Sequence, residues 1–372
     1  MRPDERPMRR LPTLEARRDT LEKCVFCPKL CRTTCPVSNE APRETLTPWG
    51  KMSMAYFSAH GDVEATESFA EPAWACTGCH ACRSACDHGN DVAGTLLDAR
   101  SALKTSGLIP AAAARAIEAF AAHETASQSA STKLARDTDA RADSKTHVVV
   151  GCGYVTHAEE SAKDIVVAAS RLTREPVAIA PGCCGLPLLY AGDQAGFVAH
   201  AERFAGSLRD AERVIVADAG CAMALRKHYP AAGVTVKPKI ELLVDVAARE
   251  LARLTTLGSN ETIRYHDPCQ LSRGLGVTEA PRAILTRILG RAPAEFETSR
   301  EQGSCAGSGG LLPITMPAIS KGISRSKTEE HERLGGGHIV TACASSLRAF
   351  RKSGAHADDI ATWIARALPD EP

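Results

Sequence analysis

Two short runs of cysteines in the first hundred residues constrain this sequence more than any other feature. The first run has the spacing C-x2-C-x3-C-x3-C and the second has C-x2-C-x2-C-x3-C. The chain starts without the apolar segment of a secretory signal, so we expect reduced thiols that act as ligands or catalysts rather than disulfides. The members of the two runs are Cys24, Cys27, Cys31 and Cys35, then Cys76, Cys79, Cys82 and Cys86.

The spacing within each run favours an iron–sulfur cubane. Thiolates two or three residues apart on a tight loop can bind three irons of one cluster, and the last cysteine of the run then ligates a second cluster. Structural zinc also uses C-x2-C pairs, but it would leave the spacing of Cys31 and Cys35 unexplained. We therefore expect two [4Fe–4S] clusters, one held by Cys24, Cys27, Cys31 and Cys86, and the other by Cys76, Cys79, Cys82 and Cys35.

The other seven cysteines follow short apolar stretches in the second part of the chain. Stretches such as 147–150, 177–180 and 214–217 alternate with amphipathic segments, which predicts parallel sheets built from βα units. The carboxyl ends of parallel strands meet at one sheet edge, so two such units facing each other would gather these cysteines in one cleft. A scatter of buried thiols is the alternative. The candidate ligands of this third site are Cys152, Cys183, Cys184, Cys221, Cys269, Cys305 and Cys343.

A stretch with little apolar character separates the two sets of cysteines. Leu134 is the only large apolar residue between positions 123 and 146, so we interpret this segment as a surface linker. The predicted organisation is an α-helical dicluster ferredoxin domain, a linker, and two tandem α/β, Rossmann-like cysteine-rich units with parallel sheets. These regions cover residues 1–122, 123–146, 147–258 and 259–372.

With these motifs the chain resembles the iron–sulfur electron-transfer subunits that carry CCG cysteine-rich domains. Similar proteins are the iron–sulfur subunits of glycolate oxidase and of anaerobic glycerol-3-phosphate dehydrogenase, lactate-utilisation iron–sulfur proteins and the heterodisulfide reductase group. The chain departs from their complete five-cysteine pattern, so neither unit can supply five thiolates alone. Ala224 stands at the last position of the first unit, and Ala306 and Ser346 replace two cysteines of the second.

The resemblance implies an oxidoreductase component that relays electrons and has no substrate-oxidising site of its own. It implies an FAD-dependent dehydrogenase for glycolate, lactate or glycerol 3-phosphate as the electron source, and a quinone or a membrane redox protein as the acceptor. The chain contains no dinucleotide-binding fingerprint, which agrees with substrate oxidation in a partner. The alternative is a heterodisulfide reductase-like thiol–disulfide oxidoreductase that uses the C-terminal cysteine cleft, centred on Cys183 and Cys184.

Charge and hydropathy argue against two classes of function. The chain has 45 Lys and Arg against 44 Asp and Glu, so it has no basic excess that would neutralise nucleic-acid phosphates. No apolar run approaches the ~18–20 residues that a membrane span requires. We therefore expect a cytoplasmic protein that binds no nucleic acid and reaches a membrane only peripherally, through its partners.

Overall fold

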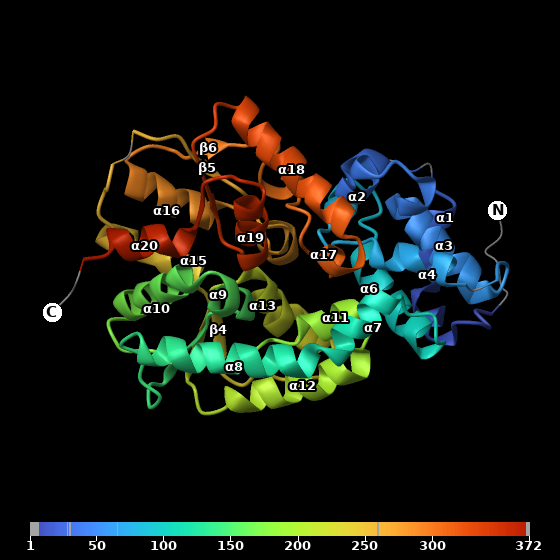
Figure 1. Cartoon of the computed structure of the whole chain (residues 1–372), viewed down its shortest axis with the longest axis horizontal. Coiled ribbons are helices and arrows are strands. Elements are labelled where there is room, and N and C mark those ends of the chain that lie inside the picture. Colours follow the sequence, from blue (N-terminus) through green and yellow to red (C-terminus); the bar gives the residue numbers. More distant parts are fainter. Residues whose placement is uncertain (1–6, 28, 30, 65, 259, 370–372) are drawn as a thin grey trace. The chain divides into compact units, whose positions relative to one another are not determined.

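The computed structural model describes residues 7–27, 29, 31–64, 66–258 and 260–369 (Figure 1). These residues form two compact units, and neither unit is continuous in sequence. The first unit contains the described residues within 1–120, 187–197 and 304–326. The second unit contains those within 121–186, 198–303 and 327–372.

The first unit is helical throughout its described residues, as the sequence predicts. Helix α3 begins where the hydroxyl of Thr47 accepts the N–H of Gly50, and α6 begins where Asp91 accepts the N–H of Gly94. Its helices are α1 (Arg18–Val25), α2 (Pro36–Glu40), α3 (Pro48–His60), α4 (Glu67–Trp74), α5 (Ala81–Ser84), α6 (Val92–Thr105), α7 (Ala111–Glu118) and α17 (Leu312–Thr315). Short 3-10 turns cover Pro12–Arg17, Arg32–Thr34 and Glu44–Leu46.

The second unit contains two four-stranded parallel sheets, as the alternating apolar stretches predict. The first sheet has the order β2-β1-β3-β4 and the second has the order β6-β5-β7-β8, so the two share one topology. The strands of the first sheet are β1 (Thr146–Val149), β2 (Ala178–Ile179), β3 (Arg213–Val216) and β4 (Lys239–Leu242). Those of the second sheet are β5 (Ile263–Tyr265), β6 (Ala294–Glu295), β7 (His338–Thr341) and β8 (Ala357–Asp359).

The contacts between the helices of the two sheets are reciprocal. Helix α10 packs on α20, and α16 packs on α15; likewise α13 packs on the π-helical turn Gln270–Gly274, and α9 packs on α19. Each contact therefore has its counterpart when the two sheets are exchanged. These helices are α9 (Cys152–His157), α10 (Glu159–Thr173), α13 (Ala219–Met223), α15 (Leu243–Arg249), α16 (Glu279–Leu289), α19 (Ala344–Lys352) and α20 (Ile360–Ala367).

The boundary between the units passes through several helices and differs from the predicted domain limits. These helices are α8 (Phe120–Arg136), α12 (Gln194–Ser207) and α18 (Pro317–Arg333), and α11 (Leu186–Ala191) begins at the boundary. Segments 187–197 and 304–326, which follow β2 and β6, belong to the first unit. The buried guanidinium of Arg100 explains this, because it donates to the carbonyl oxygens of Ala73, Cys76, Tyr190 and Gly310. Short elements complete the chain: a π-helical turn (Ala224–His228), α14 (Tyr229–Ala231), and 3-10 turns at Leu251–Arg253 and Arg300–Gln302.

The segment predicted as a surface linker begins as a helix with one buried face. Helix α8 extends to Arg136, and Ser127, Ser131 and Leu134 on one of its faces are buried. The serine hydroxyls donate to the carbonyl oxygens four residues earlier, which satisfies them without solvent. Because this buried face is mostly serine, the helix carries no apolar periodicity in the sequence.

We predict that Leu134→Ala lowers the free energy of unfolding by about 2–5 kcal/mol, because it removes a buried side chain and leaves a cavity. Thr132→Ala, on the exposed face of the same helix, should change it by no more than about 0.5 kcal/mol. Urea unfolding followed by circular dichroism measures both. Equal effects of the two substitutions would restore the linker interpretation of α8.

Candidate metal centres

A pocket in the first unit collects the first three cysteines of the first run and the last cysteine of the second. Cys24 lies near the end of α1, Cys27 and Cys31 follow it, and Cys86 arrives from the turn after α5. The other residues that line this pocket are Lys23, Lys29, Trp49, Cys82, His88, Asn90 and Val92.

A second pocket collects the complementary set of cysteines. Cys76, Cys79 and Cys82 of the second run line it together with Cys35, the last cysteine of the first run. Cys82 and Val92 line both pockets, so the two pockets are neighbours within this unit. The remaining lining residues are Val37, Pro48, Lys51, Thr77, His80 and Ala93.

The cysteine loops turn so that backbone N–H groups face sulfur. Lys29 has a φ of 70° and donates its N–H to Cys27 Sγ at 3.4 Å. Gly78 has a φ of 68° and donates in the same way to Cys76 Sγ at 3.4 Å. Such N–H···S contacts stabilise charge on sulfur, and they tune the reduction potential of any iron that the sulfur binds.

A glycine pair far along the chain lies against the second cysteine loop. Any Cβ at Gly309 would overlap the carbonyl oxygen of Thr77, and one at Gly310 would overlap that of Cys76. Only glycine permits this close approach of two backbones. The glycine-rich stretch around Cys305 therefore packs against the second cysteine loop within the first unit.

The first pocket has a side-chain amide beside its sulfurs, and its lysines are partly exposed. The side-chain amide of Asn90 donates to Cys24 Sγ at 2.9 Å, and burial still raises the pKa of Cys24 to about 12. Burial, followed by the charge of Cys27, raises the pKa of Cys31 to about 11. These sulfurs therefore need a bound cation before they can be thiolates at neutral pH.

The second pocket has buried cations beside it. Lys51 of α3 is 2% exposed, and its Nζ lies 3.5 Å from Cys35 Sγ. Burial alone would lower the pKa of Lys51, but the charges of the Cys35, Cys76 and Cys82 sulfurs outweigh it and the net shift is upwards. The lysine therefore stays charged when these sulfurs are thiolates. The guanidinium of Arg100 adds a second buried charge close to Cys76, so negative charge is better compensated here than in the first pocket.

A third group of sulfurs lies at the carboxyl end of the first sheet in the second unit. Cys152 opens α9 after β1, Cys183 and Cys184 follow β2, and Cys221 lies in α13 after β3. Thiol contacts join Cys183 to both Cys152 and Cys184, and Cys221 to Cys184. Four cysteines from three successive βα loops therefore form one connected cluster.

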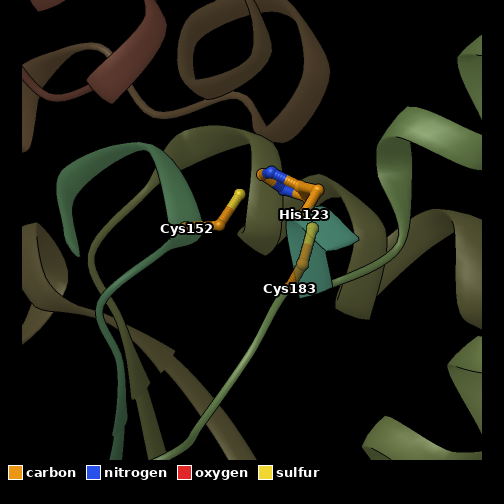
Figure 2. Close-up of side chains that lie close together, drawn as sticks. All are labelled: His123, Cys152 and Cys183. Atoms are coloured by element: carbon orange, nitrogen blue, oxygen red, sulfur yellow. The ribbon is translucent and has the colours of Figure 1, made fainter. Parts of the chain in front are cut away.

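The side chain of His123 on α8 joins this cluster. Its ring nitrogen and the sulfurs of Cys152 and Cys183 all lie within 4.8 Å of one another. Figure 2 shows the three side chains directed towards one another. The contact with Cys152 raises the pKa of His123 despite its partial burial. The sequence pattern did not identify this residue, because it lies in the segment predicted as a linker.

Protons are distributed unevenly over this cluster. The thiol of Cys183, followed in effect by the imidazole of His123, lowers the pKa of Cys152 to about 7. The thiols of Cys183 and Cys221 also lower the pKa of Cys184 well below its usual value. The pKa values of Cys183 and Cys221 rise correspondingly, because these two are the donors. Within this group, Cys183 and Cys221 therefore act as donors towards Cys152 and Cys184.

Hydrogen bonds fix the loop that carries Cys183 and Cys184. The carboxylate of Glu124 on α8 accepts the N–H of Cys183 at 2.9 Å, and Gly182, with a φ of 94°, leaves room for it. Helix α12 runs beside α8 (Figure 1). On α12, a ring nitrogen of His200 lies 2.7 Å from the carbonyl oxygen of Cys183. The hydroxyl of Tyr229 donates to the carbonyl oxygen of Cys184 at 3.0 Å.

The three cysteines of the second cysteine-rich unit occupy different surroundings. Cys343 is the N-cap residue of α19, and burial followed by the charge of Asp218 raises its pKa to about 12. Cys269 directly precedes the π-helical turn that packs on α13. Cys305 belongs to the first compact unit, where the N–H of Gly307 donates to its Sγ at 3.3 Å.

The strand register aligns the two cysteine-rich repeats differently from the spacing of their cysteines. The last paired residues of β3 and β7 are Val216, opposite the end of β4, and Thr341, opposite the end of β8. Two residues later, Asp218 caps α13 and Cys343 caps α19. Asp218 is therefore the structural counterpart of Cys343.

The interpretation of Ala224 as the position of the missing cysteine is therefore wrong. Asp218 fills that position, and Cys221, three residues later, corresponds to Ser346. The carboxylate of Asp218 accepts the N–H groups of Gly220, Cys221 and Ala344 at 2.8, 3.1 and 2.9 Å. Cys183 and Cys221 are 38 residues apart in the sequence, and so are Cys305 and Cys343. This equal spacing hid the shift, because the segments that precede β3 and β7 differ in length.

Comparison with known protein families confirms the resemblance of the motifs. A family model described as a 4Fe-4S dicluster domain matches residues 20–90. A second family model, described as a cysteine-rich domain and abbreviated CCG, matches twice, at residues 147–226 and 263–350. Among the helices of the described chain, none is long and apolar enough to cross a membrane.

Two curated relatives cover most of the chain. One is a subunit of the fumarate reductase (CoM/CoB) of Methanothermobacter marburgensis, 27% identical over 87% of this chain and 66% of that protein. Another is a subunit of the dihydromethanophenazine:CoB–CoM heterodisulfide reductase of Methanosarcina barkeri, 26% identical over 94% of both chains. A crystal structure of a hypothetical protein from Helicobacter pylori shares the fold, with a TM-score of 0.58 and 9% identity over 98% of this chain and 77% of that one.

We predict that Lys51→Met lowers the reduction potential of a centre bound in the second pocket by at least about 60 mV, a tenfold change for a one-electron couple. The substitution removes a buried charge close to the sulfurs, whereas Lys23→Met, beside the first pocket, removes a largely solvated one. Potentiometric titration followed by EPR measures both shifts. Lys51→Arg should keep most of the potential. Equal shifts for the two Met variants would show that burial of the cation has no special effect.

Proposed function

We propose that this chain, which belongs to the iron–sulfur proteins that combine a 4Fe-4S dicluster domain with paired cysteine-rich CCG domains, is the electron-transfer subunit of an oxidoreductase. In this proposal it takes electrons from an FAD-dependent dehydrogenase of the glycolate, lactate or glycerol 3-phosphate type. It passes them towards a quinone or another acceptor. The substrate is oxidised in the partner and not in this chain.

The observation that carries the proposal is the pair of neighbouring pockets lined by cysteines. Iron–sulfur clusters held there would accept and release single electrons, which is the chemistry a relay requires. At least four thiols in each pocket, loop N–H groups that donate to sulfur, and a cation or amide beside each set suit such clusters. We propose Cys24, Cys27, Cys31 and Cys86 as the ligands of one [4Fe–4S] cluster, and Cys76, Cys79, Cys82 and Cys35 as those of the other.

The connected sulfurs of the second unit support a third redox-active metal centre. Cys152, Cys183, Cys184 and Cys221 are its proposed core ligands, because they already contact one another and come from loops at one sheet edge. We give Cys269, Cys305 and Cys343 no ligand role here.

The nature of the relatives supports the proposal of a partner protein. Their names describe components of larger oxidoreductases, one a fumarate reductase and one a heterodisulfide reductase. A chain that lacks a dinucleotide fingerprint needs another protein to withdraw electrons from an organic substrate. A flavoprotein is the class of partner that converts two-electron oxidation into single-electron transfer.

A second candidate function is reduction of a mixed disulfide at the cysteines of the second unit. The observation that favours it is the contact between Cys183 and Cys184, which lowers the pKa of the Cys184 thiol. Reduction would cleave one S–S bond and consume two electrons and two protons, giving two thiols. A chemically reduced preparation of this chain that cleaves a heterodisulfide without any flavoprotein would select this candidate over the relay.

We predict that pairs of variants of the full chain show that the last cysteine of each run belongs to the cluster of the other run. Cys27→Ser and Cys86→Ser should perturb the same EPR signal, because both sulfurs line the first pocket. Cys79→Ser and Cys35→Ser should both perturb the other signal. Anaerobic reconstitution with iron and sulfide analysis provides the samples. A Cys86→Ser variant that matched Cys79→Ser instead would contradict the assignment, as would bound zinc without labile sulfide.

We also predict that the isolated, flavin-free chain does not oxidise glycolate, lactate or glycerol 3-phosphate. The reason is that its sequence carries no dinucleotide-binding fingerprint of a flavin or nicotinamide site that would accept a hydride. With its cognate flavoprotein and that enzyme's substrate, the clusters should be reduced within the turnover time of the dehydrogenase. Stopped-flow absorbance follows this reduction. Turnover of any of the three substrates by the chain alone would refute the division of labour.

A further inference from the structure

We propose that the imidazole of His123 is a ligand of the third metal centre, so that a nitrogen donor joins the thiolates of Cys152 and Cys183. This inference rests on the proposed iron–sulfur centre of the second unit and assigns one of its ligands. The ligand lies outside both cysteine-rich repeats, on the helix that precedes them.

The three donor atoms are close enough for one metal centre. The ring nitrogen of His123 and the two sulfurs lie within 4.8 Å of one another, in a partly buried setting (Figure 2). An iron–sulfur cluster can have imidazole as well as thiolate ligands, as in the Rieske type of centre, where they bind different irons of one cluster. Fe–thiolate bonds are similar in length to the ~2.3 Å of Zn–S bonds, so small side-chain adjustments would bring all three donors to one centre.

Contacts made by the residues that follow His123 connect helix α8 to the cysteine loop and to α10. The adjacent Glu124 accepts the N–H of Cys183, which ties the helix to the cysteine loop. One turn further on, the hydroxyl of Ser127 donates to the carbonyl oxygen of His123 at 2.8 Å. Lys133, near the end of the helix, pairs with Glu159 of α10 at 2.8 Å. These contacts position helix α8 so that the ring of His123 lies beside the two sulfurs.

Replacement of a cysteine in the repeat explains why an outside ligand is needed. Asp218 stands where the corresponding residue of the other repeat is Cys343. Its carboxylate accepts three backbone N–H groups, so its oxygens are committed to capping helices. The first repeat thus supplies four thiols, and His123 supplies a fifth donor that is neutral. A neutral donor in place of a thiolate makes the centre less negative and raises its reduction potential.

The test compares histidine variants of the full chain by pulsed EPR. Protein labelled with 15N-histidine, purified anaerobically and poised so that the third centre is paramagnetic, should show a strong nitrogen hyperfine coupling. His123→Ala should abolish that coupling. His157→Ala is the control, because this exposed histidine lies on α9 in the same unit but outside the group of three donor atoms. It should leave the coupling intact.

His123→Cys separates ligation from a structural role of the residue. This variant should retain the third centre, lose the nitrogen coupling and shift the potential of that centre downwards, because a thiolate replaces a neutral donor. A merely structural histidine, or one that only donates a hydrogen bond to Cys152, would give no strong coupling in the unsubstituted protein. That result, with the third centre present, would overturn the inference and leave the proposed relay standing.

Metal analysis distinguishes this failure from failure of the proposed centre itself. Iron and sulfide sufficient for three clusters, with the 15N coupling present, would support both proposals. Iron and sulfide for only two clusters, or zinc in the second unit, would remove the third iron–sulfur centre and the role of His123 with it. The two pockets of the first unit would remain as the relay.

Discussion

In the first unit, each pocket contains three cysteines of one run and the last cysteine of the other run. The rest of the first unit depends on this arrangement. Cys35 lies among the sulfurs of the second run and Cys86 among those of the first, so neither loop assembles its pocket without the other. Helices α1, α3, α4 and α6 pack together beside these loops, whose cysteines are buried or half-buried. Burial makes an uncompensated thiolate costly, so the loops and helices must supply charge or hydrogen bonds at each sulfur.

In the second unit, a repeated parallel sheet positions the cysteines. The two sheets share one strand order, and parallel strands deliver the residues that follow them to a common edge. In the first sheet these residues are the four connected cysteines. In the second sheet the equivalent loops have diverged. At the start of the helix after the third strand, the first sheet has Asp218 where the second sheet has Cys343. The symmetry of the backbone therefore carries an asymmetric distribution of sulfur.

Local spacing predicted much of this arrangement, because metal-binding loops and βα units are encoded by neighbouring residues. The helical first region, the two parallel sheets and the joint placement of Cys152, Cys183, Cys184 and Cys221 follow from such patterns. Features that depend on long-range contacts did not follow. The serine-lined face of α8 leaves no hydrophobic period, and nothing near Lys51 in the sequence marks it as a neighbour of Cys35.

The electrostatic difference between the two pockets gives the proposed relay a direction. Lys51 and Arg100 place two buried charges beside the second pocket, whereas the first has an amide and partly exposed lysines. Positive charge stabilises the reduced form of a cluster more than the oxidised form, so the second pocket favours the higher potential. Electrons that enter at the first pocket would then move downhill to the second. The pockets share Cys82 and Val92, so this step needs no intermediate carrier.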